Sequence, residues 1–272
     1  MTSPGFPQRI VCLTEETTET LYLLGEDWRI VGISGFTVRP PRARKEKPKV
    51  SAFISARIDR IVALQPDLVL GFSDLQADIA AELVKAGIEV HVFNHRSVAD
   101  ILRMIRTLGG MIGCEAKTSA LVGELSRGLD EVRARASQLK RRPRVYFEEW
   151  DEPQISAIRW VSELIGMAGG EECFPELAAQ PLGRQRIIAD PLEVVRRQPD
   201  IILGSWCGKK FQPETVCARE GWAGVAAVRE GFVREIKSPL ILQPGPAALT
   251  DGVRAIQEVI FEWDRDASGK RH

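Results

Sequence analysis

One short phrase of sequence occurs twice in this 272-residue chain. Residues 64–71 read Leu-Gln-Pro-Asp-Leu-Val-Leu-Gly, and residues 197–204 read Arg-Gln-Pro-Asp-Ile-Ile-Leu-Gly. In each copy a helix-like stretch runs into the proline, which disfavours the α conformation at the residue before it. The aliphatic run that follows fits a strand buried on both faces of a parallel sheet. Two such copies predict two similar α/β lobes, and a cleft between two lobes is a natural place for a ligand.

The rest of the chain alternates in the same way. Strand-like and helix-like segments follow one another from Arg9 to Phe93 and again from Arg144 to Asp266, a pattern typical of parallel sheets covered by helices. Between them, residues 115–140 predict one long helix. Its apolar stripe consists of Leu121, Val122, Leu125, Leu129 and Val132.

We therefore predict an α/β protein of two Rossmann-like lobes with parallel sheets, joined by a long rigid α-helix. The predicted parts are an N-terminal lobe at 1–113, a connecting helix at 114–142 and a C-terminal lobe at 143–272. A helix in this position resists wide hinge closure, so we expect only a small change of shape when a ligand binds.

Composition excludes several classes of partner. Lysine plus arginine equals aspartate plus glutamate at 37 each, which gives no global attraction to nucleic acid or an anionic membrane. No run approaches the roughly 20 apolar residues of a membrane span. Five cysteines without a framework spacing predict free thiols and a reducing compartment, and three histidines without a Cys-x-x-Cys pair argue against structural zinc. We expect a monomer that binds a small molecule.

Candidate ligand contacts lie in loops that follow predicted strands, because ligands of parallel α/β units bind at the carboxyl ends of the strands. Aromatic and polar side chains together suit a large, flat, partly apolar ring system edged with amides. For any single aromatic residue, ordinary packing is the alternative. The candidates are Glu15, Glu16, Phe36, Phe53, Phe72, Glu149, Trp150, Trp160, Trp206, Cys207 and Gly208.

No catalytic site is predicted. Paired carboxylates could do acid–base work, but a helix N-terminal charge explains Glu15 and Glu16, and a solvated loop explains residues 148–152. The glycines of 204–210 are one residue short of a phosphate-binding loop, and no Gly-x-Gly-x-x-Gly follows the first strand. Whether His95 or Cys207 contacts a metal centre stays open.

Several strings occur in the order found in one known family. They are Ser34-Gly35-Phe36 before Pro40-Pro41, the segment Lys49–Phe53, Arg159-Trp160-Val161 before Gly169-Gly170, Cys207-Gly208 and the segment Pro244–Gly252. From about residue 8 to residue 265 the chain resembles the substrate-binding proteins of ABC importers for cobalamin, haem and iron-siderophores, the class III type with a helical linker. It is most similar to the cobalamin-binding members, in a branch that often lacks signal peptides.

This resemblance implies a binding protein, not an enzyme, that holds a cobalamin-like corrinoid in the cleft between its lobes and needs no resident cofactor. Haem or an iron-siderophore is one alternative ligand. The other alternative is a cytosolic corrinoid-handling enzyme or partner on the same fold.

The resemblance also implies an ABC permease as a possible partner. Relatives carry an acidic docking residue seven positions before the proline of each repeat. Here Asp59 has that position in the first lobe, but Leu192 has it in the second, with Glu193 one place later. One residue along a helix is about 100° of rotation, so this departure puts permease docking in doubt.

The predicted location is the cytoplasm. The N-terminus shows no signal peptide, and Cys12 lies inside the first predicted strand, where burial would prevent its use as a lipid anchor. With Leu192 in place of an acid, we expect a protein that binds or buffers its ligand. The alternative is a periplasmic protein whose signal peptide is not part of this sequence.

Overall fold

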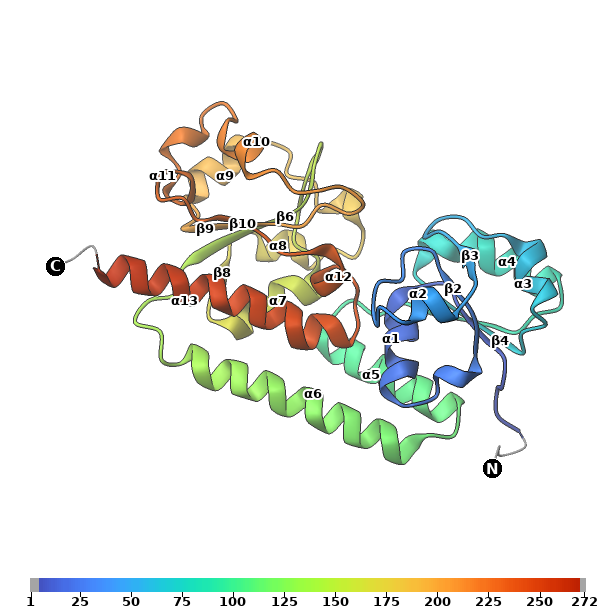
Figure 1. Cartoon of the computed structure of the whole chain (residues 1–272). Coiled ribbons are helices and arrows are strands. Elements are labelled where there is room, and N and C mark those ends of the chain that lie inside the picture. Colours follow the sequence, from blue (N-terminus) through green and yellow to red (C-terminus); the bar gives the residue numbers. More distant parts are fainter. Residues whose placement is uncertain (1–4, 270–272) are drawn as a thin grey trace. The chain divides into compact units, whose positions relative to one another are not determined.

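The computed structural model describes residues 5–269, with side chains to residue 267, as two compact units. The first unit comprises the chain up to His95, then Ala99–Leu125 and Pro244–Pro246. The second comprises Arg96–Val98, Ser126–Gln243 and the chain from Ala247 onward. Figure 1 shows the ribbon with its element labels. Each unit contains one sheet covered by helices, which confirms the predicted α/β class.

The sheet of the first unit is entirely parallel. In spatial order its strands are β3 (Lys49–Ser51), β2 (Ile30–Ser34), β1 (Ile10–Cys12), β4 (Leu68–Phe72) and β5 (Val90–Phe93). The helices are α1 (Glu15–Leu23), α2 (Ala43–Glu46), α3 (Ile58–Ala63), α4 (Ala77–Lys85) and α5 (Val98–Met111), with 3₁₀ turns at Asp27–Arg29 and Asp74–Gln76. Strands β1 and β4 are fully buried, as their aliphatic runs predict.

The second unit has a mixed sheet. In spatial order its strands are β10 (Val233–Glu235), β9 (Ile201–Gly204), β6 (Arg144–Asp151) and β7 (Gln154–Ser156), and β8 (Glu171–Glu172) also pairs with β6. All pairs are parallel except β6 with β7. We expected a polar loop after Glu148, but the chain forms a β6–β7 hairpin there, which brings Trp150 into a strand. Strand β7 has only three residues, which are too few for an alternation of polar and apolar side chains to indicate a strand.

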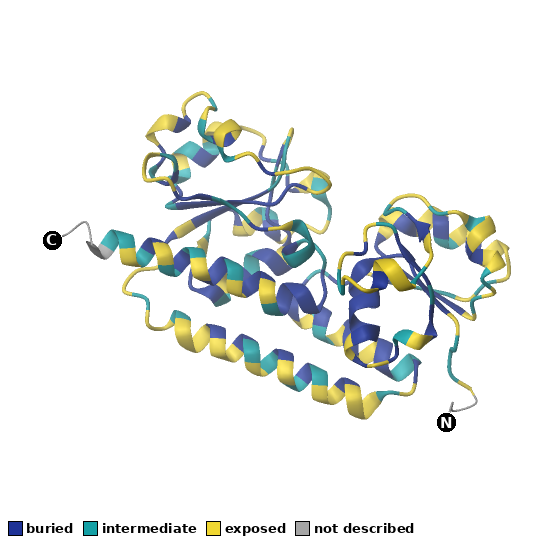
Figure 2. Ribbon diagram, viewed as in Figure 1, coloured by how far each residue is buried: buried dark blue, intermediate teal, exposed yellow. Residues whose placement is uncertain are grey.

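The remaining helices belong to the second unit, apart from α6. They are α7 (Arg159–Ala168), α8 (Pro175–Ala178), α9 (Leu192–Arg197), α10 (Pro213–Cys217), α11 (Ala226–Arg229), α12 (Ser238–Ile241) and α13 (Val253–Gly269). Short turns occur at Gly183–Gln185, Trp222–Gly224 and, with π geometry, Ala248–Gly252. Helix α13 packs on α7. Figure 2 shows that the strands of both sheets are largely buried.

The chain passes from the first unit to the second within α6 (Glu115–Ala136), a helix of 22 residues. Val122, Leu125, Leu129 and Val132 are buried, which confirms the predicted stripe, while Leu121 is half-buried. Much of the remaining surface of α6 is exposed (Figure 2). The helix ends four residues before the predicted Lys140, in a turn where the Ser137 hydroxyl donates to the carbonyl of Ala134.

The repeated phrase has the same backbone in both units. Gln65 and Gln198, which precede the prolines, are left-handed with φ of 48° and 45°. This conformation ends the preceding helix and turns the chain into the strand, since proline excludes the right-handed helical region at that residue. Glutamine rarely adopts a positive φ, so the surrounding contacts must hold it there.

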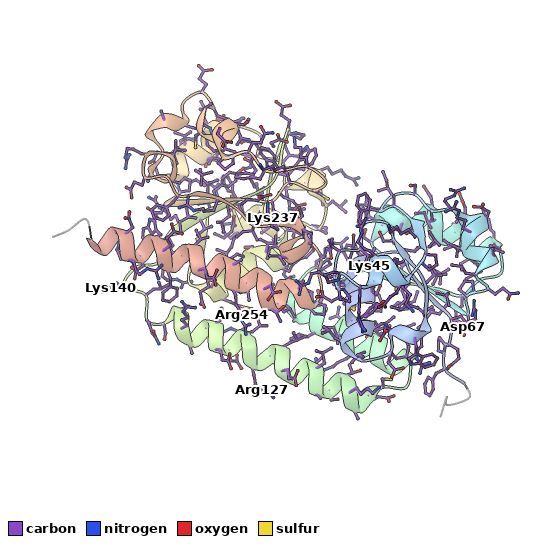
Figure 3. All side chains as sticks on the ribbon, viewed as in Figure 1. Lys45, Asp67, Arg127, Lys140, Lys237 and Arg254 are labelled. Atoms are coloured by element: carbon purple, nitrogen blue, oxygen red, sulfur yellow. The ribbon has the colours of Figure 1, made fainter. Side chains whose placement is uncertain are left out.

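The aspartate of each phrase, two residues after this glutamine, binds the backbone of a neighbouring segment. The Asp67 carboxylate accepts the backbone N–H groups of Gln8 and Arg9 at 2.6 and 2.9 Å, and lies beside the N-terminal segment in Figure 3. The Asp200 carboxylate accepts the backbone N–H of Arg144 at 2.8 Å. Each aspartate thus ties the start of its strand, β4 or β9, to the neighbouring strand, β1 or β6.

Candidate ligand-binding site

In the first unit, two buried glutamates follow β1 at the start of α1. Glu15 and Glu16 are 7% and 2% exposed, and the Thr14 hydroxyl donates to Glu16 Oε1 at 2.5 Å. Burial raises the pKa of Glu16 to about 8, and Glu15 adds a smaller repulsion. Burial also raises the pKa of Glu15. The expected stabilisation of a charged Glu16 by the helix N-terminus is therefore outweighed by desolvation, which favours the protonated form of this carboxyl group.

The segment Pro244–Pro246 covers this part of the first unit. A Cβ on Gly245 would come within 2.6 Å of Glu16 Cβ, so only glycine fits against α1. His95 Nε2 lies 2.7 Å from the Pro244 carbonyl oxygen, and its ring contacts Phe72 edge-on at 4.9 Å between centroids. These contacts give His95 a structural role.

Three predicted phenylalanines lie at or beyond the carboxyl ends of strands in the first unit. Phe36 is 52% exposed, Phe53 is half-buried and Phe72 is 7% exposed at the end of β4. Gln76, which sequence reasoning missed, organises this edge. It is fully buried, its side-chain amide donates to the Phe53 carbonyl at 2.8 Å, and its carbonyl accepts the Phe72 N–H at 2.9 Å.

In the second unit, the buried carboxylate of Glu148 in β6 is held by three donors. Tyr146 Oη lies 2.9 Å from Oε2, Trp206 Nε1 lies 3.0 Å from Oε1, and Arg219 reaches both oxygens at 2.5 and 2.9 Å. The negative charge of Glu148 helps to raise the pKa of the Tyr146 hydroxyl, although burial contributes more. This network fixes Trp206, which follows β9, against β6.

The predicted candidate Glu149 forms a bidentate ion pair with Arg186 at 2.7 and 2.8 Å. Arg186 is 1% exposed and ties the β6–β7 hairpin to the chain before α9. Trp160 is part of the core of the second unit, because it is only 3% exposed and its indole N–H donates to the Ile241 carbonyl at 2.8 Å. Neither Arg186 nor Arg219 could be singled out from sequence, because their carboxylate partners are 37 and 71 residues away.

Trp150 and Trp206 meet around a lysine. Lys209 Nζ lies 4.5 Å from the Trp150 ring centroid and 4.8 Å from that of Trp206, and it pairs with the Asp151 carboxylate at 2.6 Å. Cys207 and Gly208, in the same loop, are exposed, and Gly208 has a φ of 79°. The structure thus brings together four of the predicted residues at the carboxyl ends of β6 and β9, with Lys209 as the residue that sequence reasoning missed.

A pocket of about 800 Å³ lies beside this cluster within the second unit. Its walls come from the hairpin turn Asp151–Gln154, from the segment Ile187–Leu192 before and at the start of α9, and from Arg219–Trp222. None of the predicted ligand contacts lines it. Leu192, the residue in place of an acid, stands at this pocket with 46% of its surface exposed.

The two predicted docking acids differ in their surroundings. Asp59 in α3 is exposed and, among the residues the structure describes, forms no ion pair. Glu193 in α9 pairs with Arg196 at 2.7 Å and with Arg197 at 3.0 Å, and these arginines lower its pKa. The Glu193 carboxylate is therefore already neutralised by its own helix.

Within residues 5–269, no group of three or more His, Cys, Asp or Glu side chains is placed to hold a metal ion. None of the five cysteines, all of which lie in the described part of the chain, forms a disulfide. Over the same residues, no helix has both the length and the apolar character needed to cross a bilayer.

Comparison with known proteins identifies the family. The family model for periplasmic binding proteins matches residues 10–240. The chain belongs to the periplasmic binding protein family. The family consists of binding proteins, so the prediction of a binding protein rather than an enzyme is confirmed, and the enzyme alternative is excluded.

Individual relatives are distant but cover most of the chain. The ABC transporter substrate-binding lipoprotein YvrC of Bacillus subtilis is 25% identical over 94% of this chain and 80% of its own length. A vitamin B12-binding protein of Vibrio parahaemolyticus is 25% identical over 89% of this chain and 86% of its own.

Solved structures confirm the fold. A possible iron-binding, periplasmic solute-binding protein of Staphylococcus epidermidis has a TM-score of 0.80 at 19% identity, covering 94% of this chain and 99% of its own. The periplasmic vitamin B12 binding protein BtuF of Vibrio cholerae has a TM-score of 0.74 at 20% identity, covering 94% and 98%. The haem complex of IsdE from S. aureus has a TM-score of 0.76 at 20% identity, covering 93% and 98%. The predicted class III architecture, two α/β lobes with a long helix, is confirmed.

Proposed function

We propose that this protein binds a cobalamin-like corrinoid through the strand-end loops of both units. One observation carries the proposal: Trp150 and Trp206 lie together at the carboxyl ends of β6 and β9, each held by its own indole N–H. Trp150 Nε1 donates to the Glu152 carbonyl at 2.9 Å, and Trp206 Nε1 donates to Glu148 at 3.0 Å. The ring faces of two fixed indoles suit a large, partly apolar macrocycle.

Two further findings support this ligand class. Curated relatives from Vibrio that cover most of this chain are named vitamin B12-binding proteins. In the first unit, Phe36 presents a largely exposed aromatic ring beyond β2, where a partly apolar ligand can pack against it.

Haem and ferric siderophores are the alternative ligands, since solved proteins of this fold include haem complexes. Calorimetric and visible-absorption titrations with cobinamide, cobalamin, haemin and a ferric siderophore separate them. We expect saturable heat with cobinamide and cobalamin at similar affinity, because the ring and not the nucleotide tail is recognised. Saturable binding of haemin or the siderophore alone would contradict the proposal.

We also propose that the protein retains its ligand in the cytoplasm instead of delivering it to an ABC permease. The support is the neutralised Glu193 and, over the described residues, five cysteines that form no disulfide, which suits a reducing compartment. Fractionation of cells that express the full native gene tests the location. Release of the protein by osmotic shock would refute the cytoplasmic location. Co-purification with a permease would refute the proposal that the protein does not dock to one.

A further inference from the structure

The cluster around Lys209 has the composition of a binding site for a cation. Two indole faces and one carboxylate surround the ammonium group: Trp150 at 4.5 Å, Trp206 at 4.8 Å and Asp151 at 2.6 Å. The faces of tryptophan attract cations through the ring quadrupole, and this attraction grows when water is excluded. We use the name aromatic cage for Trp150, Trp206 and Asp151.

The aromatic cage is rigid without Lys209. Each indole is anchored by its N–H, Trp150 to the Glu152 carbonyl and Trp206 to Glu148. Behind Trp206, Phe211 contacts the indole edge-on at 4.8 Å between centroids. Phe211 is itself packed so closely on β9 that a Cβ on Gly204 would lie 1.8 Å from its ring. The cage is therefore built by the fold of the second unit.

Lys209 is the more exposed member of its ion pair with Asp151. Its side chain is 42% exposed and lies on the loop between β9 and α10, whereas Asp151 is 14% exposed in β6. Lys209 reaches the cage across a short length of chain, so it acts as a tethered ligand with an effective concentration in the millimolar range.

We propose that Trp150, Trp206 and Asp151 form a recognition site for an organic ammonium group, with Lys209 as the resident occupant. An incoming amine or quaternary ammonium takes the place of the lysine ammonium, and Lys209 moves into solvent. Lys209 thereby excludes weakly bound amines, and only a ligand with additional contacts displaces it. This site lies wholly within the second unit and shares Trp150 and Trp206 with the proposed corrinoid contacts, but binding of a small ammonium ion there can be measured without a corrinoid.

Choline is a suitable probe, and 3,3-dimethylbutan-1-ol is its neutral isostere. Both are titrated into the wild-type protein and the Lys209→Ala variant, with tryptophan fluorescence and calorimetry as readouts. Removing the Lys209 ammonium should tighten choline binding at least tenfold. In the wild type, choline can bind only to the fraction of molecules whose cage is not occupied by Lys209, and its apparent affinity is reduced by that fraction. The alcohol should show no saturable binding, and Trp150→Leu in the Lys209→Ala background should abolish the choline signal.

Equal choline affinity in the wild type and Lys209→Ala, or equal binding of choline and its neutral isostere, would overturn the proposal. Lys209→Gln serves as a second variant under the same criteria, with circular dichroism to confirm folding of both. Cobinamide titrations on the same samples keep the two proposals apart, since loss of corrinoid binding with retained choline selectivity contradicts only the proposed function.

Discussion

The α3–β4 segment of the first unit and the α9–β9 segment of the second have the same backbone conformation around the repeated phrase. The side chains that pack on the ends of their strands differ. Both contain a left-handed glutamine, an aspartate that binds a neighbouring strand, and a glycine at or near the end of the buried strand. Beyond the glycine the two diverge. Gln76 lies over Gly71 in the first unit, and Phe211 lies over Gly204 in the second.

This divergence shows where the fold is repeated and where function differs. In the first unit the buried amide of Gln76 joins the loops after β3 and β4 by hydrogen bonds, and Phe36 after β2 is exposed. In the second unit an aromatic wedge and a buried ion pair fix Trp206 instead. The same contrast holds for the buried glutamates, because Glu148 has a cation and Glu16 has a hydroxyl partner.

The largest expected effect comes from Glu148. In Glu148→Gln the Arg219 guanidinium loses its charged partner inside the protein, which should cost about 3–5 kcal/mol of unfolding free energy. Urea denaturation measures the loss, and Asp130→Asn in the exposed ion pair of Asp130 with Arg133 in α6 is the comparison variant. Equal stability of the two variants would mean that the Glu148 network does not hold the second unit together.

The two strand glycines should respond unequally to alanine. Gly204→Ala places a methyl group 1.8 Å from the Phe211 ring and should cost about 3 kcal/mol. Gly71→Ala makes one tight contact, with Gln76 Oε1 at 3.0 Å, and ordinary contacts with Leu13 and Val92 at 3.7 Å, and it should cost about 1 kcal/mol, because an amide can shift slightly. Thermal unfolding of both variants tests this order. Phe211→Leu should partly rescue Gly204→Ala, and its failure to do so would place the strain elsewhere.

The raised pKa of Glu16 predicts that the stability of the protein depends on pH. The folded-state pKa of about 8 exceeds the usual 4.5, so the native state keeps a proton that the unfolded chain loses above pH 4.5. Stability should therefore fall as pH rises from about 5 to 8, by on the order of 1 kcal/mol per pH unit from this group.

Glu16→Gln, which is neutral at every pH, should flatten that slope. Part of it should remain, because burial raises the pKa of Glu172 to about 7 in the same direction. Urea midpoints at pH 5, 6, 7 and 8 provide the measurement. An unchanged slope in the variant would show that Glu16 is ionised in the folded protein.

The aspartates of the repeated phrase should give the smallest effects. Asp67→Ala removes the acceptor of two backbone N–H groups, and Asp200→Ala removes the acceptor of one. We expect losses of about 2 and about 1 kcal/mol, respectively, by urea denaturation. A larger loss for Asp200→Ala would mean that its longer contact with the Arg144 side chain, at 3.6 Å, matters more than the backbone bond.

Local sequence rules were sufficient for the fold. A proline precedes and a glycine ends the aliphatic run of both β4 and β9, and the apolar stripe of α6 follows helical periodicity. These elements could therefore be predicted without knowledge of tertiary contacts. The β6–β7 hairpin could not, because its second strand has three residues and its pairing depends on Arg186.

The candidate site was only partly accessible to sequence reasoning. Placing ligand contacts at strand ends selected Trp150 and Trp206, which the structure places on either side of Lys209. Lys209, Arg219 and Gln76 act through partners distant in the sequence, which sequence reasoning could not identify. Trp160 is of a residue type that is common at ligand contacts, but the structure buries it like a core residue. Burial of a single aromatic side chain is a tertiary property that the residue type does not reveal.

Cobinamide titration of three variants tests the central claim that strand-end aromatics of both units bind a corrinoid. Phe36→Ala and Trp150→Ala each remove a proposed contact, one from each unit. Trp28→Ala removes a comparably exposed ring in the turn before β2 that stacks on Arg29, away from the strand ends, and serves as the control. Calorimetry should show at least tenfold weaker cobinamide binding in the first two variants and unchanged affinity in Trp28→Ala. Unchanged affinity in both Phe36→Ala and Trp150→Ala, or no binding of cobinamide to the wild-type protein, would contradict the account.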